Sequence, residues 1–480
     1  MTTREGSALK ALLDVKPSPE QLALFSRVRP GVEVIRGAAG SGKTSTALLK
    51  LRSSVGFYIS RMKRQAKPRP ISVLVLTFNR TLRGYIAELA ESQLQESNQV
   101  LFEISTFSAW AAALLKNPEI IDTPNAHQQI KLLGAHLKID PDYLCDEVDY
   151  ILGKYQPAKL GEYVTGRRDG RGRAHRVDRT LRDAIVREVI GPYISYKQKK
   201  KVMDWSDLAT TLVDQKISSY DVVVVDETQD FSANEIRAVI NQLSAEHTVT
   251  FVLDTTQRIY TRSAFTWSEL GLVVRPENSA TLDINYRNTR QIARFAAGIL
   301  DGLPPDSDGA LPNYQSALRD GEKPTVIVGR YKNQLKYVVQ FIKKSVDLEK
   351  ESVAFLHPRG GGWFDHTQDI LKRNNLLYVM IARNRDWPQG DENIALSTFH
   401  SAKGLEFDYV VMIGMSNEVM PIDDQETAED GTNESLKQAR RITAMAVGRA
   451  KKQVILGFSP TTAPSVTDYF VADTYTKIDV

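Results

Sequence analysis

Residues 37–44 read Gly-Ala-Ala-Gly-Ser-Gly-Lys-Thr, a spacing of residue types that can hold a triphosphate. Glycines let successive backbone N–H groups turn inward around an anion, and a following helix adds the positive end of its dipole. Lys43 can place a charge at the β- and γ-phosphates, and the Thr44 hydroxyl can ligate Mg²⁺. The alternative is a chance glycine-rich turn. The predicted nucleotide cradle comprises Gly37, Gly40, Ser41, Gly42, Lys43, Thr44 and Ser45.

A second chemical pattern is the carboxylate pair Asp226-Glu227, which directly follows the apolar run Val222–Val225. The first carboxylate can hold Mg²⁺, and the second can orient and deprotonate a water molecule. Such a pair is a weak signal alone. It becomes strong together with the phosphate loop, and the two predict a chain that binds and hydrolyses a nucleoside triphosphate with Mg²⁺.

The elements that must position these residues are short apolar runs of strand length, separated by helical stretches. Unbroken rather than alternating apolarity predicts strands buried on both faces of parallel sheets. The predicted class is therefore α/β, with one sheet before about residue 280 and another after it. Nine strands are expected, at Val32–Ile35, Val73–Leu76, Val222–Val225, Val249–Leu253, Thr325–Val328, Val353–Leu356, Ile394–Leu396, Val410–Ile413 and Val454–Leu456. Helices are expected at Ser45–Leu51, Leu82–Leu94 and Asn234–Leu243.

Residues 110–205 interrupt this rhythm, because they lack long β-type runs and have mostly helical composition. We expect a helical insertion there. The first α/β domain would then comprise residues 1–109 and 206–280, and the second residues 281–480.

The bulk composition limits the class of protein. A chain of 480 residues allows two to four domains, and it contains no apolar stretch of membrane-spanning length and no secretory signal at its start. Cys145 is the only cysteine, which excludes disulfides and cysteine-based zinc sites within the chain. These features predict a cytoplasmic protein.

Positive charge is concentrated in one segment, although the net charge of the whole chain is only +4. Between Lys154 and Lys201 there are 14 Lys and Arg against 5 Asp and Glu. Such a run can be an ordinary solvated face, or it can contact a polyanion. We favour the polyanion contact because the same chain carries the nucleotide-hydrolysis motifs described above. The densest part contains Arg167, Arg168, Arg171, Arg173, Arg176, Arg179 and Arg182, followed by Lys197, Lys199, Lys200 and Lys201.

Further motifs occur in a fixed order along the chain. They are Pro19-Glu20-Gln21, Leu76–Arg80, Ser105-Thr106-Phe107, Asp254–Tyr260, Asn285-Tyr286-Arg287, Ser397–Phe407 and Ala444–Lys451. With Asp226–Asp230 they resemble the motifs of the UvrD/Rep/PcrA branch of superfamily 1 helicases. That resemblance covers nearly the whole chain, and it implies two RecA-like domains with ATP between them.

The resemblance also implies roles for individual residues. Gln21, Tyr286 and Glu406 would contact the adenine edge, the adenine face and the sugar. Gln257, Arg287 and Arg449 would act at the γ-phosphate, the last two as arginine fingers. Phe78, Thr106, Tyr260, Thr398 and His400 would face single-stranded nucleic acid, as would Arg167, Arg171 and Arg173 of the basic segment. For the aromatic residues, Phe107 included, ordinary core packing is the competing interpretation.

Two departures from the family pattern bear on function. Arg262 stands where the family has a stacking Trp, and only polar residues near Asn384–Asn393 stand where it inserts a large domain. The leading hypothesis is an ATP-dependent translocase or helicase on single-stranded nucleic acid, DNA rather than RNA, moving 3′ to 5′. The alternative is an ATP-gated nucleic-acid-binding subunit that regulates a nuclease or defence complex. DNA repair, plasmid maintenance and phage defence all remain open as pathways.

Overall fold

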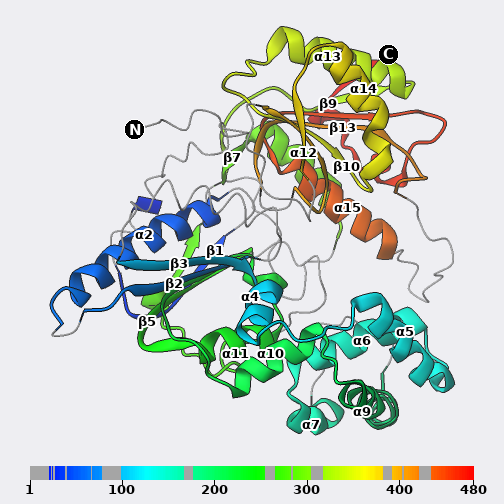
Figure 1. Cartoon of the computed structure of the whole chain (residues 1–480). Helices are drawn as coiled ribbons and strands as arrows, with labels where there is room; N and C mark the ends of the chain where they lie inside the picture. Colours follow the sequence, from blue (N-terminus) through cyan, green and yellow to red (C-terminus); the bar gives the residue numbers. More distant parts are fainter. Residues whose placement is uncertain are drawn as a thin grey trace.

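The fold consists of two parallel β-sheets with helices on their faces and a helical unit beside the first sheet (Figure 1). The computed structural model describes residues 21–22, 24, 28–37, 41–65, 68–77, 99–166, 177–254, 265–282, 285–303, 317–381, 392–402, 405–420 and 434–480. Of Asp254, Tyr286, Glu434 and Ser435 it describes only the backbone. Within these ranges no helix is both long enough and apolar enough to cross a membrane.

The first sheet has six parallel strands in the order β3-β2-β4-β5-β1-β6. Strand β5 lies between β1 and β4, so the strand before the phosphate loop and the strand before the carboxylate pair are not neighbours. All six residues of β4 are buried, as its unbroken apolar run predicts. The strands are β1 (Gly31–Gly37), β2 (Ile71–Thr77), β3 (Val100–Thr106), β4 (Tyr220–Val225), β5 (Leu243–Asp254) and β6 (Ser279–Leu282). Helices α2 (Lys43–Met62) and α11 (Ala233–Asn241) accompany them.

Between β3 and β4 the described chain is helical and has its own core, which includes Tyr150, Ile151, Val189 and Tyr193. Aspartates accept the N-terminal amides of its helices α5, α6, α8 and α10, as helix capping predicts. The helices are α4 (Phe107–Leu114), α5 (Thr123–Gly134), α6 (Pro141–Lys154), α7 (Leu160–Thr165), α8 (Arg179–Ala184), a π-helical segment (Ile185–Ile190), α9 (Gly191–Lys200) and α10 (Trp205–Asp214).

This helical unit is fastened to the helix that follows the carboxylate pair. Asn234 Nδ2 donates to Leu152 O at 2.9 Å and to Tyr155 O at 3.1 Å, and Arg237 Nη1 donates to Lys154 O at 2.7 Å. The C-terminal end of α6 is therefore hydrogen-bonded to α11.

The second sheet has seven parallel strands in the order β11-β12-β10-β13-β14-β9-β15. They are β9 (Thr325–Val328), β10 (Val353–His357), β11 (Tyr378–Ile381), β12 (Ile394–Thr398), β13 (Phe407–Met415), β14 (Ala450–Phe458) and β15 (Thr476–Asp479). Helices α12 (Arg290–Leu300) and α15 (Glu434–Val447) belong to the core on one face, and α13 (Tyr331–Ser345) and α14 (Asp365–Arg373) to the core on the other. A short ribbon pairs β7 (Asn285–Thr289) with β8 (Ala317–Arg319).

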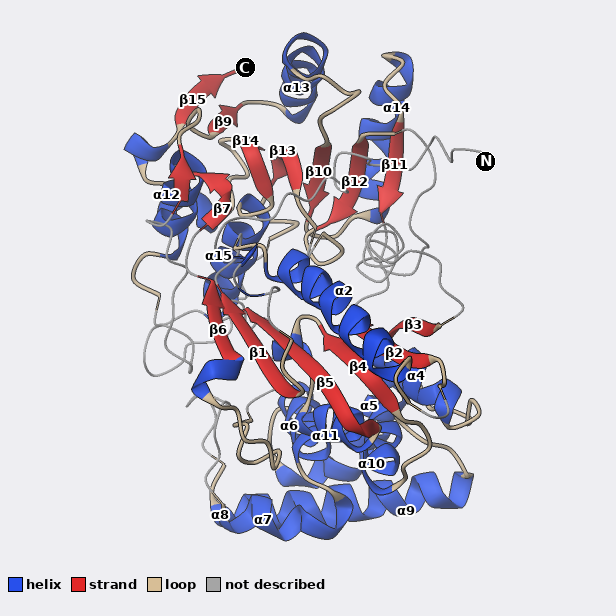
Figure 2. Ribbon diagram, turned by 90° about the vertical axis from the view of Figure 1, so that its left-hand side faces the viewer, coloured by secondary structure: helices blue, strands red, loops and turns tan. Residues whose placement is uncertain are grey.

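The two sheets present strand ends to each other. In Figure 2 the arrowheads of β10, β11 and β12 point toward the first sheet, and that of β6 points toward the second. In parallel α/β sheets, ligands bind beyond the carboxyl ends of the strands. The motif residues that follow strands of the first sheet and those that follow strands of the second are therefore expected in the space between the two sheets.

All nine predicted strands occur; Thr325–Val328 has the predicted bounds, and each of the others has one or more added residues. The helix expected at Asn234–Leu243 ends earlier, at Asn241, so its predicted end was wrong. The reason is tertiary, because the buried Gln242 side chain accepts the amides of Ile217 and Ser218, and Leu243 begins β5 opposite Tyr220. The helix expected at Leu82–Leu94 lies outside the described residues.

Candidate nucleotide and nucleic-acid site

Two described residues of the phosphate loop, between β1 and α2, occupy positions that require glycine. A Cβ on Gly37 would lie 2.4 Å from Ser41 Oγ. Gly42 precedes α2 with φ of 77°, and a Cβ there would lie 2.3 Å from Gln21 Nε2. Lys43 and Thr44 open the helix, so they lie at its positive end. Gly40 lies outside the described residues.

Gln21 is buried against this loop. Its Nε2 donates to Gly42 O at 2.9 Å. This hydrogen bond ties the segment before β1 to the N-terminus of α2. Its expected contact with adenine stays a prediction.

The two nucleotide motifs of the first sheet meet directly. Thr44 Oγ1 donates to Asp226 Oδ2 at 2.9 Å, across 182 positions of the chain. Burial, with the neighbouring charge of Glu227, raises the pKa of Asp226 above its usual range. A hydroxyl and a carboxylate oxygen are ligands that Mg²⁺ accepts, and Mg²⁺ takes few protein ligands when phosphates supply others. This donor set fits Mg²⁺.

Glu227 has an unusual backbone conformation. Its φ of 50° and ψ of 42° are left-handed, and its side chain is buried. Non-glycine residues in this region cost about 1–3 kcal/mol and collect at functional sites. Gln229 Nε2 donates to Glu227 Oε2, and Asp230 N donates to Glu227 O at 2.9 Å, so both ends of the residue are held.

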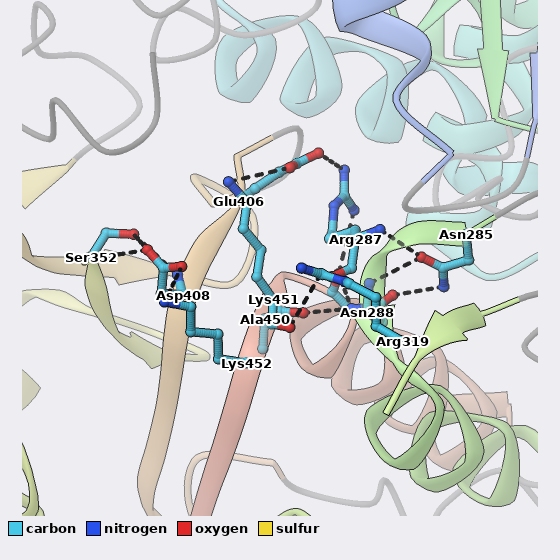
Figure 3. A network of polar contacts seen from close by, with 11 residues as sticks. Asn285, Arg287, Asn288, Arg319, Ser352, Glu406, Asp408, Ala450, Lys451 and Lys452 are labelled. Atoms are coloured by element: carbon cyan, nitrogen blue, oxygen red, sulfur yellow. Dashed lines mark hydrogen bonds and ion pairs between the residues drawn. The ribbon is translucent and has the colours of Figure 1, made fainter. Parts of the chain in front are cut away.

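The second domain contributes a mainly positive cluster around Glu406, in contrast to the carboxylates Asp226 and Glu227 of the first (Figure 3). Arg287 forms an ion pair with Glu406 and donates through Nη1 to Gly448 O at 3.3 Å. Lys451 Nζ lies 3.7 Å from the other carboxylate oxygen of Glu406. Burial would raise the pKa of Glu406, but the charges of Arg287, Lys451 and Arg449 lower it to about 2. The structure therefore brings together Arg287, Glu406 and Arg449, which the sequence analysis placed at the nucleotide.

Asn288 is a positioning residue that the sequence analysis missed. Its Nδ2 donates to Gly448 O at 3.2 Å and to Ala450 O at 2.6 Å, and it exchanges hydrogen bonds with Asn285 (Figure 3). Arg287 is thus carried on a ribbon fastened to the start of β14. The only sequence signal was its place directly after Asn-Tyr-Arg.

The predicted nucleic-acid residues within the described ranges lie at strand ends. Thr106, the last residue of β3, accepts Ala109 N at 3.4 Å and so caps α4. Thr398, at the end of β12, accepts Ser401 N at 3.0 Å. His400 is exposed and lines a cavity of about 220 Å³. Phe107 is buried against Trp110 and Phe231, so the core interpretation holds for it and stacking on a base does not.

The described part of the basic segment divides into buried and exposed charges. Lys197 is 3% exposed and lies 2.7 Å from carboxylates of both Asp204 and Asp207, so it cannot contact a polyanion as the sequence suggested. Arg182 donates to Val177 O and Gly166 O within the fold. The described Lys and Arg of the segment that are exposed are Lys159, Arg179, Arg187, Lys199, Lys200 and Lys201.

Several predicted residues lie outside the described ranges. They are Gly40, Phe78, Gln257, Tyr260, Arg167, Arg171 and Arg173, together with the side chain of Tyr286. Their roles stay predictions.

Comparison with known proteins agrees with this arrangement. The chain matches the AAA domain family over residues 20–263 and the UvrD-like helicase C-terminal domain family over residues 365–460. A probable DNA helicase of Mycoplasma pneumoniae is 21% identical over 459 residues, covering 89% of this chain and 80% of that protein. An ATP-dependent DNA helicase Rep of Buchnera aphidicola (subsp. Acyrthosiphon pisum) is 34% identical over 149 residues, covering 28% of this chain and 22% of its own.

A solved C-terminal domain of a possible DNA helicase from Lactobacillus plantarum covers 40% of this chain and 98% of its own, with 21% identity and a TM-score of 0.29. The fold and the order of motifs define a P-loop NTPase with two RecA-like domains. Within that class, the chain belongs to the UvrD-like superfamily 1 helicases.

Proposed function

We propose that the protein is an ATP-dependent motor that moves along single-stranded DNA in the 3′ to 5′ direction. The observation that supports the proposal is that the predicted nucleotide groups form two clusters, one beside each sheet. The first α/β domain supplies Thr44, Asp226 and Glu227, and the second supplies Arg287, on the β7-β8 ribbon, and Arg449, directly before β14. We divide the chain accordingly, with residues 110–205 as the helical insertion in the first α/β domain. The boundary between the two α/β domains is placed near residue 280, a position that falls within β6.

In this mechanism Lys43 binds the β- and γ-phosphates, and Thr44 with Asp226 would hold Mg²⁺, which screens their charge when bound. Glu227 orients the attacking water and takes its proton. Arg287 leaves Glu406 and, with Arg449, meets the charge that develops on the γ-phosphate. Since these cations belong to the second domain, hydrolysis requires the two domains to close, and product release lets them open.

The test is ATP hydrolysis by the full chain with no polymer, with single-stranded DNA, with duplex DNA and with RNA. We expect Mg²⁺-dependent turnover that single-stranded DNA stimulates most. Turnover that is indifferent to every polymer would contradict the motor. Direction is measured separately, by displacement of streptavidin from a biotin at the 5′ end or at the 3′ end of a single strand; a 3′ to 5′ motor clears the 5′ end.

A second candidate is an ATP-gated subunit of a nuclease or defence complex with little unwinding activity. The observation that favours it is the direct parallel pairing of β11 with β12, joined only by residues 382–393, where the resemblance implies a large domain. We therefore expect the chain alone to unwind a long tailed duplex poorly even where it translocates. Robust unwinding by the isolated protein would remove this candidate.

A further inference from the structure

The second domain contains a cavity that the nucleotide mechanism does not use. Its volume is about 270 Å³, and it lies between the ends of β10 and β13 on the side of α13 and α14. It is separate from the smaller cavity lined by His400. Its lining is mostly apolar and rich in rings, and includes Tyr331, Phe355, His357, Trp363, Phe364 and Val411.

His357, the last residue of β10, contributes a polar side chain to this lining and has an exposed fraction of 7%. Its Nδ1 accepts the amides of Arg359 at 3.2 Å and Gly360 at 3.1 Å. An imidazole that accepts at Nδ1 carries its proton on Nε2. Burial, with the charge of Arg359, lowers the pKa of His357 to about 4, so the ring is neutral at pH 7. Within the described part of the chain, Nε2–H has no acceptor.

Aromatic rings surround this donor in fixed orientations. Trp363 stacks on His357 with centroids 5.1 Å apart and planes 20° apart, and Phe364 meets the same ring edge-on at 5.9 Å. Across the cavity the Tyr331 hydroxyl lies 2.6 Å from Thr367 Oγ1. Trp363 is 40% exposed, so it also forms part of the outer rim.

The cavity lies next to Thr398 and His400, the residues predicted to contact single-stranded nucleic acid. A Cβ on Gly360 would lie 2.6 Å from Thr398 Cγ2, so the loop after His357 touches Thr398. Pro358, in the same loop, lines the His400 cavity. A single strand that contacts Thr398 and His400 therefore passes beside the His357 cavity.

We propose that this cavity receives one unstacked base of the bound strand, packed against Trp363 and accepting a hydrogen bond from His357 Nε2–H. The proposal rests on the proposed function, because it requires a bound single strand. A planar ring with an edge acceptor fits both the apolar walls and the unpartnered donor. An aliphatic side chain of a protein partner would leave that donor unpaired, which is costly. Because every base has a π-face and an edge acceptor, little base preference is expected.

The experiment measures the affinity of the full-length protein for oligothymidylate and for an abasic strand of equal length. Trp363→Ala should weaken oligothymidylate binding by roughly 5- to 150-fold, the range for one stacked base, and leave abasic binding unchanged. His357→Asn keeps a side-chain oxygen that can accept the amides of Arg359 and Gly360 but lacks Nε2–H, and should weaken it by roughly 2- to 10-fold. Trp205→Ala, at a tryptophan of similar exposure (44%), is the matched control and should bind normally. Basal ATP hydrolysis without DNA should be normal in all three, which shows that they fold.

Two results would overturn the inference while the proposed function stands. Wild-type affinity of Trp363→Ala for oligothymidylate would mean that the cavity takes no base and is a packing void or a protein-docking pocket. Equal losses on the intact and abasic strands would mean that the loop acts through the sugar-phosphate backbone. If wild-type protein binds neither strand, the proposed function fails together with the inference.

Discussion

The two halves of the proposed nucleotide site bury charge of opposite sign. In the half on the first sheet, Asp226 and Glu227 lie side by side, and burial with mutual repulsion favours the protonated form of Asp226. In the half on the second sheet, three cations surround Glu406 and favour its ionised form. One half can therefore receive a metal cation, and the other can receive negative phosphate. Mg²⁺ and the γ-phosphate are complementary to these halves in that order.

The strongest test of this comparison removes a cation from the second half. Arg449→Ala should lower ATP turnover by roughly 10³–10⁵-fold, the usual worth of an arginine finger, while ATP still binds the first half. Turnover and nucleotide affinity are measured together. The matched control is Arg294→Ala, whose side chain is 66% exposed and paired with Asp473. Near-normal turnover in Arg449→Ala would show that the two halves do not form one site.

The next test removes the base from the first half. Glu227→Gln keeps the side chain's shape and should reduce hydrolysis by roughly 10²–10⁴-fold with Mg²⁺-ATP affinity retained. Asp226→Asn should instead weaken Mg²⁺-dependent ATP binding, because it removes a metal ligand. Glu246→Gln, an exposed carboxylate, is the control. Normal turnover in Glu227→Gln would assign the base to another group.

A smaller effect, on stability, tests the charge balance of the second half. The pKa of Glu406 is lowered from its ordinary value of 4.5 to about 2. Its ion pairs therefore contribute their full stability above pH 4.5, and this contribution is lost as the pH falls to about 2. Glu406→Gln should therefore lower the free energy of unfolding at pH 7 by roughly 2–3 kcal/mol, with a difference that narrows in acid. Urea unfolding at several pH values measures it, with Glu349→Gln as the exposed control. A pH-independent difference would mean that packing, not charge, is responsible.

The smallest expected effect lies outside both halves, in the basic segment. Replacing Lys199, Lys200 and Lys201 by Gln should lower the slope of log affinity against log salt by about 0.7 for each phosphate that the protein no longer neutralises, with ATP affinity unchanged. The same change at the exposed Lys336, Lys344 and Lys372 of α13 and α14 is the control. An unaltered slope would assign the segment to solvent or to a protein partner.

Sequence reasoning succeeded where the signal was local. The strands were found because unbroken β-branched runs are typical of parallel sheets, and the phosphate loop because its geometry depends on the spacing of a few neighbouring residues. It failed where burial decided the outcome. Lys197 was counted among free charges, but it is buried against Asp204 and Asp207.

The sequence by itself determined which chemical groups the protein has, their order, and the strands that carry them, because these depend on residue type and short-range spacing. Only the tertiary structure decided which groups share one environment. Thr44 meets Asp226, Arg287 meets Glu406 and Asn288 meets Ala450 across long stretches of chain. It also decided the left-handed backbone of Glu227 and the tautomer of His357. Desolvation, ion pairing and hydrogen bonding act over a few ångströms of space, so they cannot be predicted from how far apart two residues lie along the chain.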